Sequence, residues 1–240
     1  MFRFIASRLL QSAVVLLVMS FVIYGLIGLM PGDPIDIMVN SNPGYTAQDI
    51  ARLRAQYGLD QPLTTRYWNW LQAAVTLDFG YSRTYSQPVM TVMLPALWQT
   101  AKLVAVSFVV FTGVALTLGI TAALAKGTML DRIINLLAFA GISVPVFFLA
   151  LMLIYFFAVR LGWLPASGMF TIGGDGSLAD STKYLVLPVL TLTAAFAGRF
   201  TRFTRASMAE VLRMDYIRTA RAKGASKLRV VFIHALRNAL

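Results

Sequence analysis

The sequence predicts an all-α integral membrane protein, and three observations support that fold class. Of the 240 residues, 58% are hydrophobic, and the mean hydropathy is +0.70. Only 13% are charged, whereas a soluble domain carries about 25%. The apolar residues also fall into blocks long enough to cross a bilayer. Because there is no cysteine and His234 is the single histidine, the chain itself lacks the side chains for thiolate sites or histidine-based metal sites.

Four apolar blocks form the predicted spans. The first runs over about 9–30, and its roughly 22 residues at 1.5 Å each cover a hydrocarbon core of about 30 Å. The other three run over about 103–125, 133–159 and 184–198. None of the blocks carries a charge in its interior, where each charge would cost about 2.5–3.5 kcal/mol on insertion.

Basic residues predict the side of the membrane that each loop occupies. Arg3 and Arg8 precede the first span without an acid, and Lys126 and Arg132 flank Asp131 between the second and third spans. With four alternating spans, both segments lie on the same side as the basic C-terminal stretch. The positive-inside bias makes that side the cytoplasm. We therefore expect a multi-pass protein whose N-terminus is cytoplasmic.

The segment 31–98 is too polar to span and is expected to form a small helical region on the outer side. One helix is predicted between Thr46, which is suited to capping its start, and Gly58, which ends it. A second helix is predicted for the run LTTRYWNWLQAAVTL. Its Trp68 and Trp70 fit two positions equally well, the headgroup level of the membrane or the core of an external cap.

The main functional signal is the stretch from Arg199 to Leu240. It holds ten Lys and Arg against two acids, which is +8 of the net charge of +11. Helical spacing continues from the fourth span to Gly224, which predicts a helix that ends there, and Ser226 is placed to cap a new one. Small residues surround the resulting corner, namely Ala220, Ala222 and Ala225. A basic helix that merely adheres to anionic lipid is the alternative, but it does not need a corner.

At this point the sequence resembles a known family. The stretch DYIRTARAKGASKLRVVFIHALRNAL is similar to the cytoplasmic coupling loop of ATP-binding-cassette (ABC) importer permeases, in the version of the peptide and nickel branch. Further segments are similar to the first permease subunit of that branch: PGDP, YGLDQPL, DFGYS, SVPVFF and LGWLPASG. Arg218 and Thr219 stand where the general signature has Glu and Ala. The peptide branch shares this departure, so docking is still expected.

The resemblance implies a fold and an organisation along the chain. It implies the transmembrane fold of a type I ABC importer, truncated before its last two spans because the sequence stops at Leu240. The expected parts are an N-terminal span (1–30), an external helical segment (31–98) and a permease core (99–240) with its coupling loop over about 206–240. A chain that really ended at Leu240 is expected not to transport.

The resemblance also implies a transport subunit and not an enzyme. Such a permease moves a peptide or a related small solute inward, driven by ATP-Mg on separate cytoplasmic ATPase subunits. The chain has no G-x-x-x-x-G-K-[ST] phosphate loop, and we expect it to bind no cofactor and no metal. The other expected partners are a second homologous permease, an external substrate-binding protein and membrane lipid, without nucleic acid. Dipeptides, longer peptides, glutathione-like molecules, peptide antibiotics and nickel all stay open as substrates.

The residues expected to couple the permease to the ATPase surround Gly224. They are Asp215, Tyr216, Arg218, Thr219, Ala220, Arg221, Ala222, Lys223, Gly224, Ala225 and Ser226. Ser143 and Pro145 in the third span are candidates for the transport pathway, because a proline removes a backbone hydrogen bond and such kinks line cavities. Helix packing alone is the alternative for these two residues. Gly113 and Gly119 in the second span are predicted to allow close helix packing.

Two other classes of protein predict different features. An ion-coupled secondary transporter predicts an acidic or histidine relay within the spans, and the four predicted spans contain none. A non-transporting membrane scaffold has no need for a glycine corner. The sequence therefore favours a permease of an ATP-driven importer.

Overall fold

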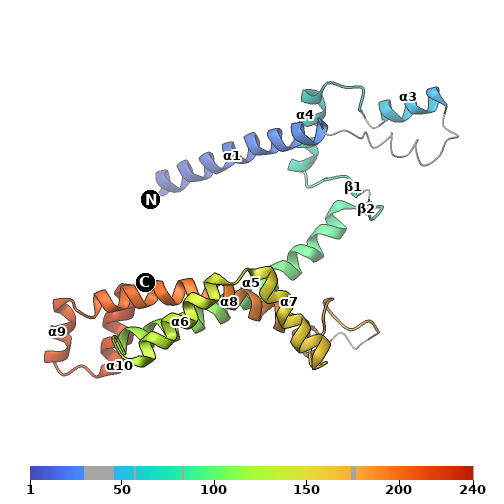
Figure 1. The fold of residues 1–240 in the computed structure, drawn as a ribbon. Helices are drawn as coiled ribbons and strands as arrows, with labels where there is room; N and C mark the ends of the chain where they lie inside the picture. The colour runs from blue at the N-terminus through green and yellow to red at the C-terminus, as the bar shows by residue number, and fades with distance from the viewer. Residues whose placement is uncertain (30–45, 57, 83, 174–176, 240) are drawn as a thin grey trace. The chain divides into compact units, whose positions relative to one another are not determined.

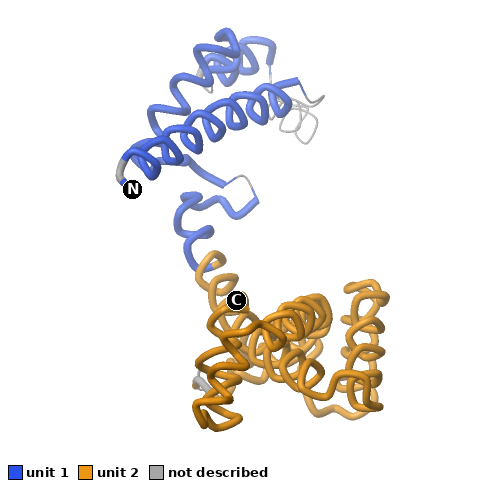
Figure 2. The backbone as a smooth tube through the Cα atoms, turned by 90° about the vertical axis from the view of Figure 1, so that its left-hand side faces the viewer, with its two compact units in different colours: residues 1–95 blue, residues 96–240 orange. Residues whose placement is uncertain are grey.

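The structure is a computed structural model that describes residues 1–29, 46–56, 58–82, 84–173 and 177–239. The PGDP motif lies outside the described residues. Two compact units divide the chain, Met1–Pro95 and Ala96–Leu240 (Figure 2). The sequence analysis placed the start of the permease core at residue 99.

Three described helices are long and apolar enough to cross a membrane: α1 (Phe2–Gly28), α5 (Val89–Leu124) and α8 (Leu178–Val211) (Figure 1). The consecutive helices α6 (Met129–Ser143) and α7 (Val146–Leu153), with a π-helical extension of α7, meet the same criterion when they are taken together as one broken span. The predicted all-α membrane fold is therefore confirmed.

In the first unit, α4 (Leu63–Val75) packs against α1 through aromatic rings. Tyr67 and Trp70 of α4 each lie with their ring centroid 5.7 Å from that of Tyr24 of α1. Trp68, by contrast, is 58% exposed. The two tryptophans thus differ, since Trp70 belongs to a small aromatic core and Trp68 faces outward.

The short helix α3 (Ala47–Gln56) begins at a capping box, as the sequence predicts. The Thr46 hydroxyl donates to the Asp49 carboxylate at 2.6 Å, the Thr46 backbone N–H donates to it at 3.0 Å, and the Asp49 N–H donates back to the hydroxyl at 3.3 Å. These bonds from the Thr46 side chain and backbone hold the pKa of Asp49 below its usual range. Gly58, with a φ of +63°, follows the end of the helix.

A two-residue antiparallel strand pair, β1 (Tyr81–Ser82) and β2 (Gln87–Pro88), leads directly into α5. The helix begins 14 residues before the predicted span at 103. Its 36 residues extend about 54 Å at 1.5 Å per residue, which is longer than a hydrocarbon core of about 30 Å. A continuous apolar block marks only the part of such a helix that crosses the hydrocarbon core, so the first turns of α5 were not included in the predicted span.

Of the four predicted spans, the third agrees least with the observed helices. Instead of one helix over 133–159, α6 ends at Ser143 and α7 starts at Val146, with a bend of 99° between them. Val144 adopts an extended backbone (φ −85°, ψ 127°), because the ring of Pro145 disfavours the helical conformation for the residue before it. The π-helix η1 (Ile154–Arg160) continues α7.

The long helix α8 is the packing centre of the second unit. A β-carbon on Gly198 would clash with the backbone of α6, and one on Gly141 of α6 would lie 2.9 Å from a carbonyl oxygen of α8. Gly119 brings α5 equally close, since a β-carbon there would lie 2.6 Å from the side chain of a threonine on α8. The packing prediction is confirmed for Gly119. It stays a prediction for Gly113, whose β-carbon would meet nothing within 4 Å among the described residues.

Four short elements complete the chain: α9 (Asp215–Ala222), α10 (Lys227–Arg229), the π-helix η2 (Val230–Leu236) and α11 (Arg237–Ala239). The prediction that one helix continues from the fourth span to Gly224 is wrong, because α8 ends at Val211 and α9 is separate. Met214 is extended (φ −68°, ψ 149°). This turn lets the apolar face of α9 pack back on the helices instead of pointing into water.

Candidate functional site

Residues 212–239, here called the corner segment, fold back onto the ends of two spanning helices. One apolar cluster joins Ile120 and Ala123 of α5, Met208 and Val211 of α8, and the buried side chains of the corner segment. The latter are Ile217, Ala220, Val230, Val231 and Ala235. Burial of a large aliphatic side chain contributes about 1.5–3 kcal/mol. The cluster therefore fixes the corner segment firmly to α5 and α8.

Gly224 makes the corner itself. Its φ of +81° lies in the left-handed region that residues with a β-carbon rarely adopt. The N–H of Ala225 donates to the carbonyl of Ala220 at 3.1 Å, which closes the end of α9. The Ser226 hydroxyl accepts from the N–H of Arg229 at 3.4 Å and caps α10, as the sequence predicts. A β-carbon at Gly224 would meet nothing within 4 Å, so the outer side of the corner is open.

Most residues proposed for coupling lie on the surface of this corner. Exposed members are Asp215, Tyr216, Arg218, Thr219, Arg221, Ala222, Lys223, Gly224 and Ser226. Ala225 is half-buried, and Ala220 is only 8% exposed because it belongs to the apolar cluster. Ala220 therefore packs inside the protein, and its part in coupling stays a prediction.

A buried ion pair that was not predicted from the sequence lies next to the corner segment. The Arg205 guanidinium on α8 donates twice to the carboxylate of Asp131 on α6, at 2.5 and 2.7 Å. Asp131 is 4% exposed and also accepts the Gly127 N–H at 3.0 Å and the Asn135 amide at 2.7 Å. The pair thus ties the α5–α6 loop, α6 and α8 together. No sequence pattern joins residues 74 positions apart, so Asp131 had counted as a loop charge and Arg205 as one of the basic residues of the C-terminal stretch.

A groove of about 800 Å³ opens between the end of α5 and the corner segment. Apolar side chains line most of it, with Arg221 and Lys227 also on its wall. Leu228, which belongs to the lining, is 72% exposed. The corner segment therefore presents apolar and basic surface together beside Gly224.

The two candidate pathway residues lie at the α6–α7 bend. The Ser143 hydroxyl donates to the Phe139 carbonyl of its own helix at 3.0 Å. Neither Pro145, which holds the N-cap position of α7, nor Ser143 lines the groove beside Gly224 or the cavities along α8. A role in the pathway stays a prediction for both.

These features define a polytopic membrane protein, with spanning helices and a folded corner packed onto two of them. Comparison with known families identifies the family to which it belongs. Residues 115–240 match the family described as binding-protein-dependent transport system inner membrane component, and residues 1–104 match the N-terminal family of the same membrane components. The chain belongs to this family and is an ABC permease of the peptide/nickel branch, with the all-α transmembrane fold of type I importers.

Individual relatives cover the whole chain. A protein of Brucella suis biovar 1 (strain 1330), whose name describes a peptide permease, is 39% identical over 241 residues, which are 100% of this chain and 76% of the relative. The glutathione transport system permease protein GsiC of Escherichia coli (strain K12) is 40% identical over 244 residues, 100% of this chain and 74% of its own length. GsiC of Salmonella typhimurium (strain LT2) shows the same identity and coverage.

Family membership determines several general properties. The chain is a multi-pass inner-membrane protein and a membrane subunit of an ABC transport system. A binding-protein-dependent system implies a substrate-binding protein and an ATPase as partners. An ion-coupled transporter and a passive scaffold therefore lose their support.

Proposed function

We propose that this permease moves a short peptide or a related small solute inward and is coupled to its ATPase through the corner around Gly224. ATP-Mg binds to the ATPase subunits, and a second homologous permease completes the pathway. The N-terminus and the corner segment lie on the cytoplasmic side, in line with the basic residues of both.

The attachment of the corner segment carries this proposal. A surface that transmits movement must be joined stiffly to the helices that move. The apolar cluster joins α9 and η2 to α5 and α8, while the outer side of Gly224 stays open. A partner that pushes on the corner would therefore displace the ends of two spanning helices.

The names of the relatives favour short peptides as the substrate class. One relative is named a peptide permease and others glutathione permeases, and glutathione is itself a tripeptide. The ligand of the binding protein that works with this permease would test the substrate class directly.

Substitution at Gly224 tests the coupling. Gly224→Ala and Gly224→Trp carry the same backbone strain, about 1–2 kcal/mol for a left-handed residue, and neither β-carbon meets the chain's own atoms. Only the tryptophan fills the space in front of the corner. We expect Gly224→Trp to lose ATPase co-purification and peptide uptake, while Gly224→Ala retains much of both.

Gly162→Trp is the matched control, because Gly162 also has a positive φ (+64°) and open space around it. It lies in the segment expected on the opposite side of the membrane, so ATPase co-purification should survive there. If Gly224→Trp keeps both the ATPase and uptake, the coupling proposal is wrong.

The absence of cysteine makes the orientation simple to test. A single cysteine at position 3 should be protected from a membrane-impermeant thiol reagent in intact cells, and one at position 61 should react. The reverse pattern would overturn the proposed orientation.

A further inference from the structure

Two adjoining cavities lie along the C-terminal part of α8, the first next to the end of α5 and the second between α8 and α6. The first is about 430 Å³ and has Lys126, Glu210 and Arg213 in its lining. The second is about 380 Å³ and has Arg199 and Arg202 in its lining. Both cavities share two α8 residues, one of which is the ion-paired Arg205.

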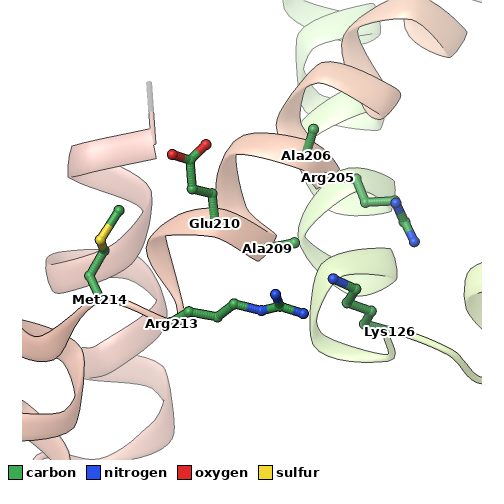
Figure 3. A pocket seen from close by; sticks show the side chains of 7 residues that line it. All are labelled: Lys126, Arg205, Ala206, Ala209, Glu210, Arg213 and Met214. Carbon is green, nitrogen blue, oxygen red and sulfur yellow. The ribbon is translucent and has the colours of Figure 1, made fainter.

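Most of the cations that line these cavities have no acidic partner among the residues that the structure describes. Arg205 is matched by Asp131, but the other four basic residues make no hydrogen bond or ion pair within the part of the chain that the structure describes. Figure 3 shows the side chains of Lys126 and Arg213 pointing toward one another, while the carboxylate of Glu210 points away. Two like charges that converge on one cavity favour an anion between them.

The surroundings indicate which anion fits. Arg and Lys bind phosphate oxygens through charge-assisted hydrogen bonds. The second cavity adds apolar walls, because Ile142 and Phe203 line it and Phe203 is 61% exposed. A free inorganic anion would gain nothing from these walls, whereas a lipid carries both a phosphate and an acyl chain.

The position of the cavities agrees with a lipid headgroup. The Asp131–Arg205 pair lies in the first turn of α6, where a spanning segment begins. Arg199 lies about 9 Å along α8 on one side of this level, at 1.5 Å per residue, and Arg213 follows the end of α8 on the other side. Basic pockets between helices at such a level bind anionic headgroups.

We infer that these two cavities form a site for the phosphate groups of an anionic phospholipid, with an acyl chain along Phe203 and Ile142. The site is separate from the coupling surface around Gly224. It also differs from general attraction of a basic segment to a membrane, in which every exposed Lys or Arg would count equally.

The test uses the complete transporter in nanodiscs of phosphatidylcholine with added phosphatidylglycerol, followed by washing and mass spectrometry of the retained lipid. The double variants Lys126→Gln/Arg213→Gln and Arg199→Gln/Arg202→Gln should each retain roughly tenfold less phosphatidylglycerol. Arg229→Gln/Arg237→Gln removes the same charge from exposed positions outside both cavities and should retain lipid normally. Arg199→Lys/Arg202→Lys keeps the charge and should retain most of the lipid, which also checks folding.

Three results would overturn the site. The first is an equal loss in the control variant, which would mean general surface attraction. The second is equal thermal protection of the detergent-solubilised transporter by inorganic phosphate and by phosphatidylglycerol, which would mean a free-anion site. The third is loss of the ATPase from the cavity variants with lipid retained, which would mean a protein contact. Gly224→Trp should instead lose the ATPase and keep the lipid, so the lipid site and the coupling proposal fail independently.

Discussion

The Asp131–Arg205 pair allows a stability prediction with a definite asymmetry. The Arg205 side chain is 26% exposed and that of Asp131 only 6%. Removing Arg205 leaves a buried carboxylate with two weaker donors, Gly127 and Asn135, whereas neutralising Asp131 leaves a cation that water still reaches. Arg205→Gln should therefore destabilise the protein more than Asp131→Asn.

The magnitudes follow from the geometry. Arg205→Gln leaves a buried charge without its partner, which costs about 3–5 kcal/mol. Asp131→Asn loses only charge-assisted hydrogen bonds, which costs about 1.5–3 kcal/mol. At roughly 2–4 °C per kcal/mol for a chain of this size, the melting temperature should fall by about 6–20 °C for Arg205→Gln and about 3–12 °C for Asp131→Asn.

Thermal melting of the purified transporter, followed by tryptophan fluorescence, measures both variants. The double variant Asp131→Asn/Arg205→Gln should lose less than the sum of the single losses, because no charge is stranded. Arg132→Gln, an exposed charge next to Asp131 on α6, should melt like the parent protein. Equal melting of the two single variants would refute the reasoning from unequal burial.

Three further predictions concern other parts of the chain. Gly198→Ala should destabilise the protein by about 1–3 kcal/mol, as overpacking does, because the new β-carbon meets the backbone of α6. Gly113→Ala should leave the melting temperature unchanged, and equal melting temperatures of the two variants would contradict this packing. The bonds from Thr46 that lower the pKa of Asp49 stabilise α3 fully at pH values above the ordinary pKa of Asp, and they are lost when Asp49 is protonated. The amides of α3 should therefore exchange hydrogen faster as the pH falls through the folded-state pKa of Asp49. Asp49→Asn should remove that pH dependence. Ile217→Ala deletes a fully buried side chain, should cost about 2–5 kcal/mol, and should expose the corner segment to trypsin; unchanged cleavage would show that Ile217 does not hold it.

Local chemistry in the sequence predicted the ends of several helices correctly. Thr46 caps α3, Gly224 ends α9 and Ser226 caps α10 in the structure, because a cap depends on residues only three or four positions apart. Side chains that satisfy a helix end are therefore visible in the sequence before any tertiary contact is known.

Features that depend on direction or distance could not be predicted in the same way. The apolar block over 133–159 is continuous, so it predicted a single span. Pro145 predicted a kink in that span, but neither signal gives the 99° angle of the bend. Residues 212–214, which follow the end of α8, include neither glycine nor proline. The break there has no local signal, because burial of the apolar face of α9 causes it. The Asp131–Arg205 pair depends on how α6 packs against α8, which no local pattern encodes.

The glycine contact between α6 and α8 also sets the mechanics of the second unit. A slide of one helical turn would replace Gly198 at the contact by Ala194 or Arg202, and each carries a β-carbon that the α6 backbone cannot admit. The two helices are therefore locked in register and must move as one rigid body. Rotation within this unit is left to non-helical joints such as residues 144–145 between α6 and α7, because the corner segment itself is packed onto α5 and α8. The stroke of a transport cycle would therefore be a swing about such joints and not a sliding of helices.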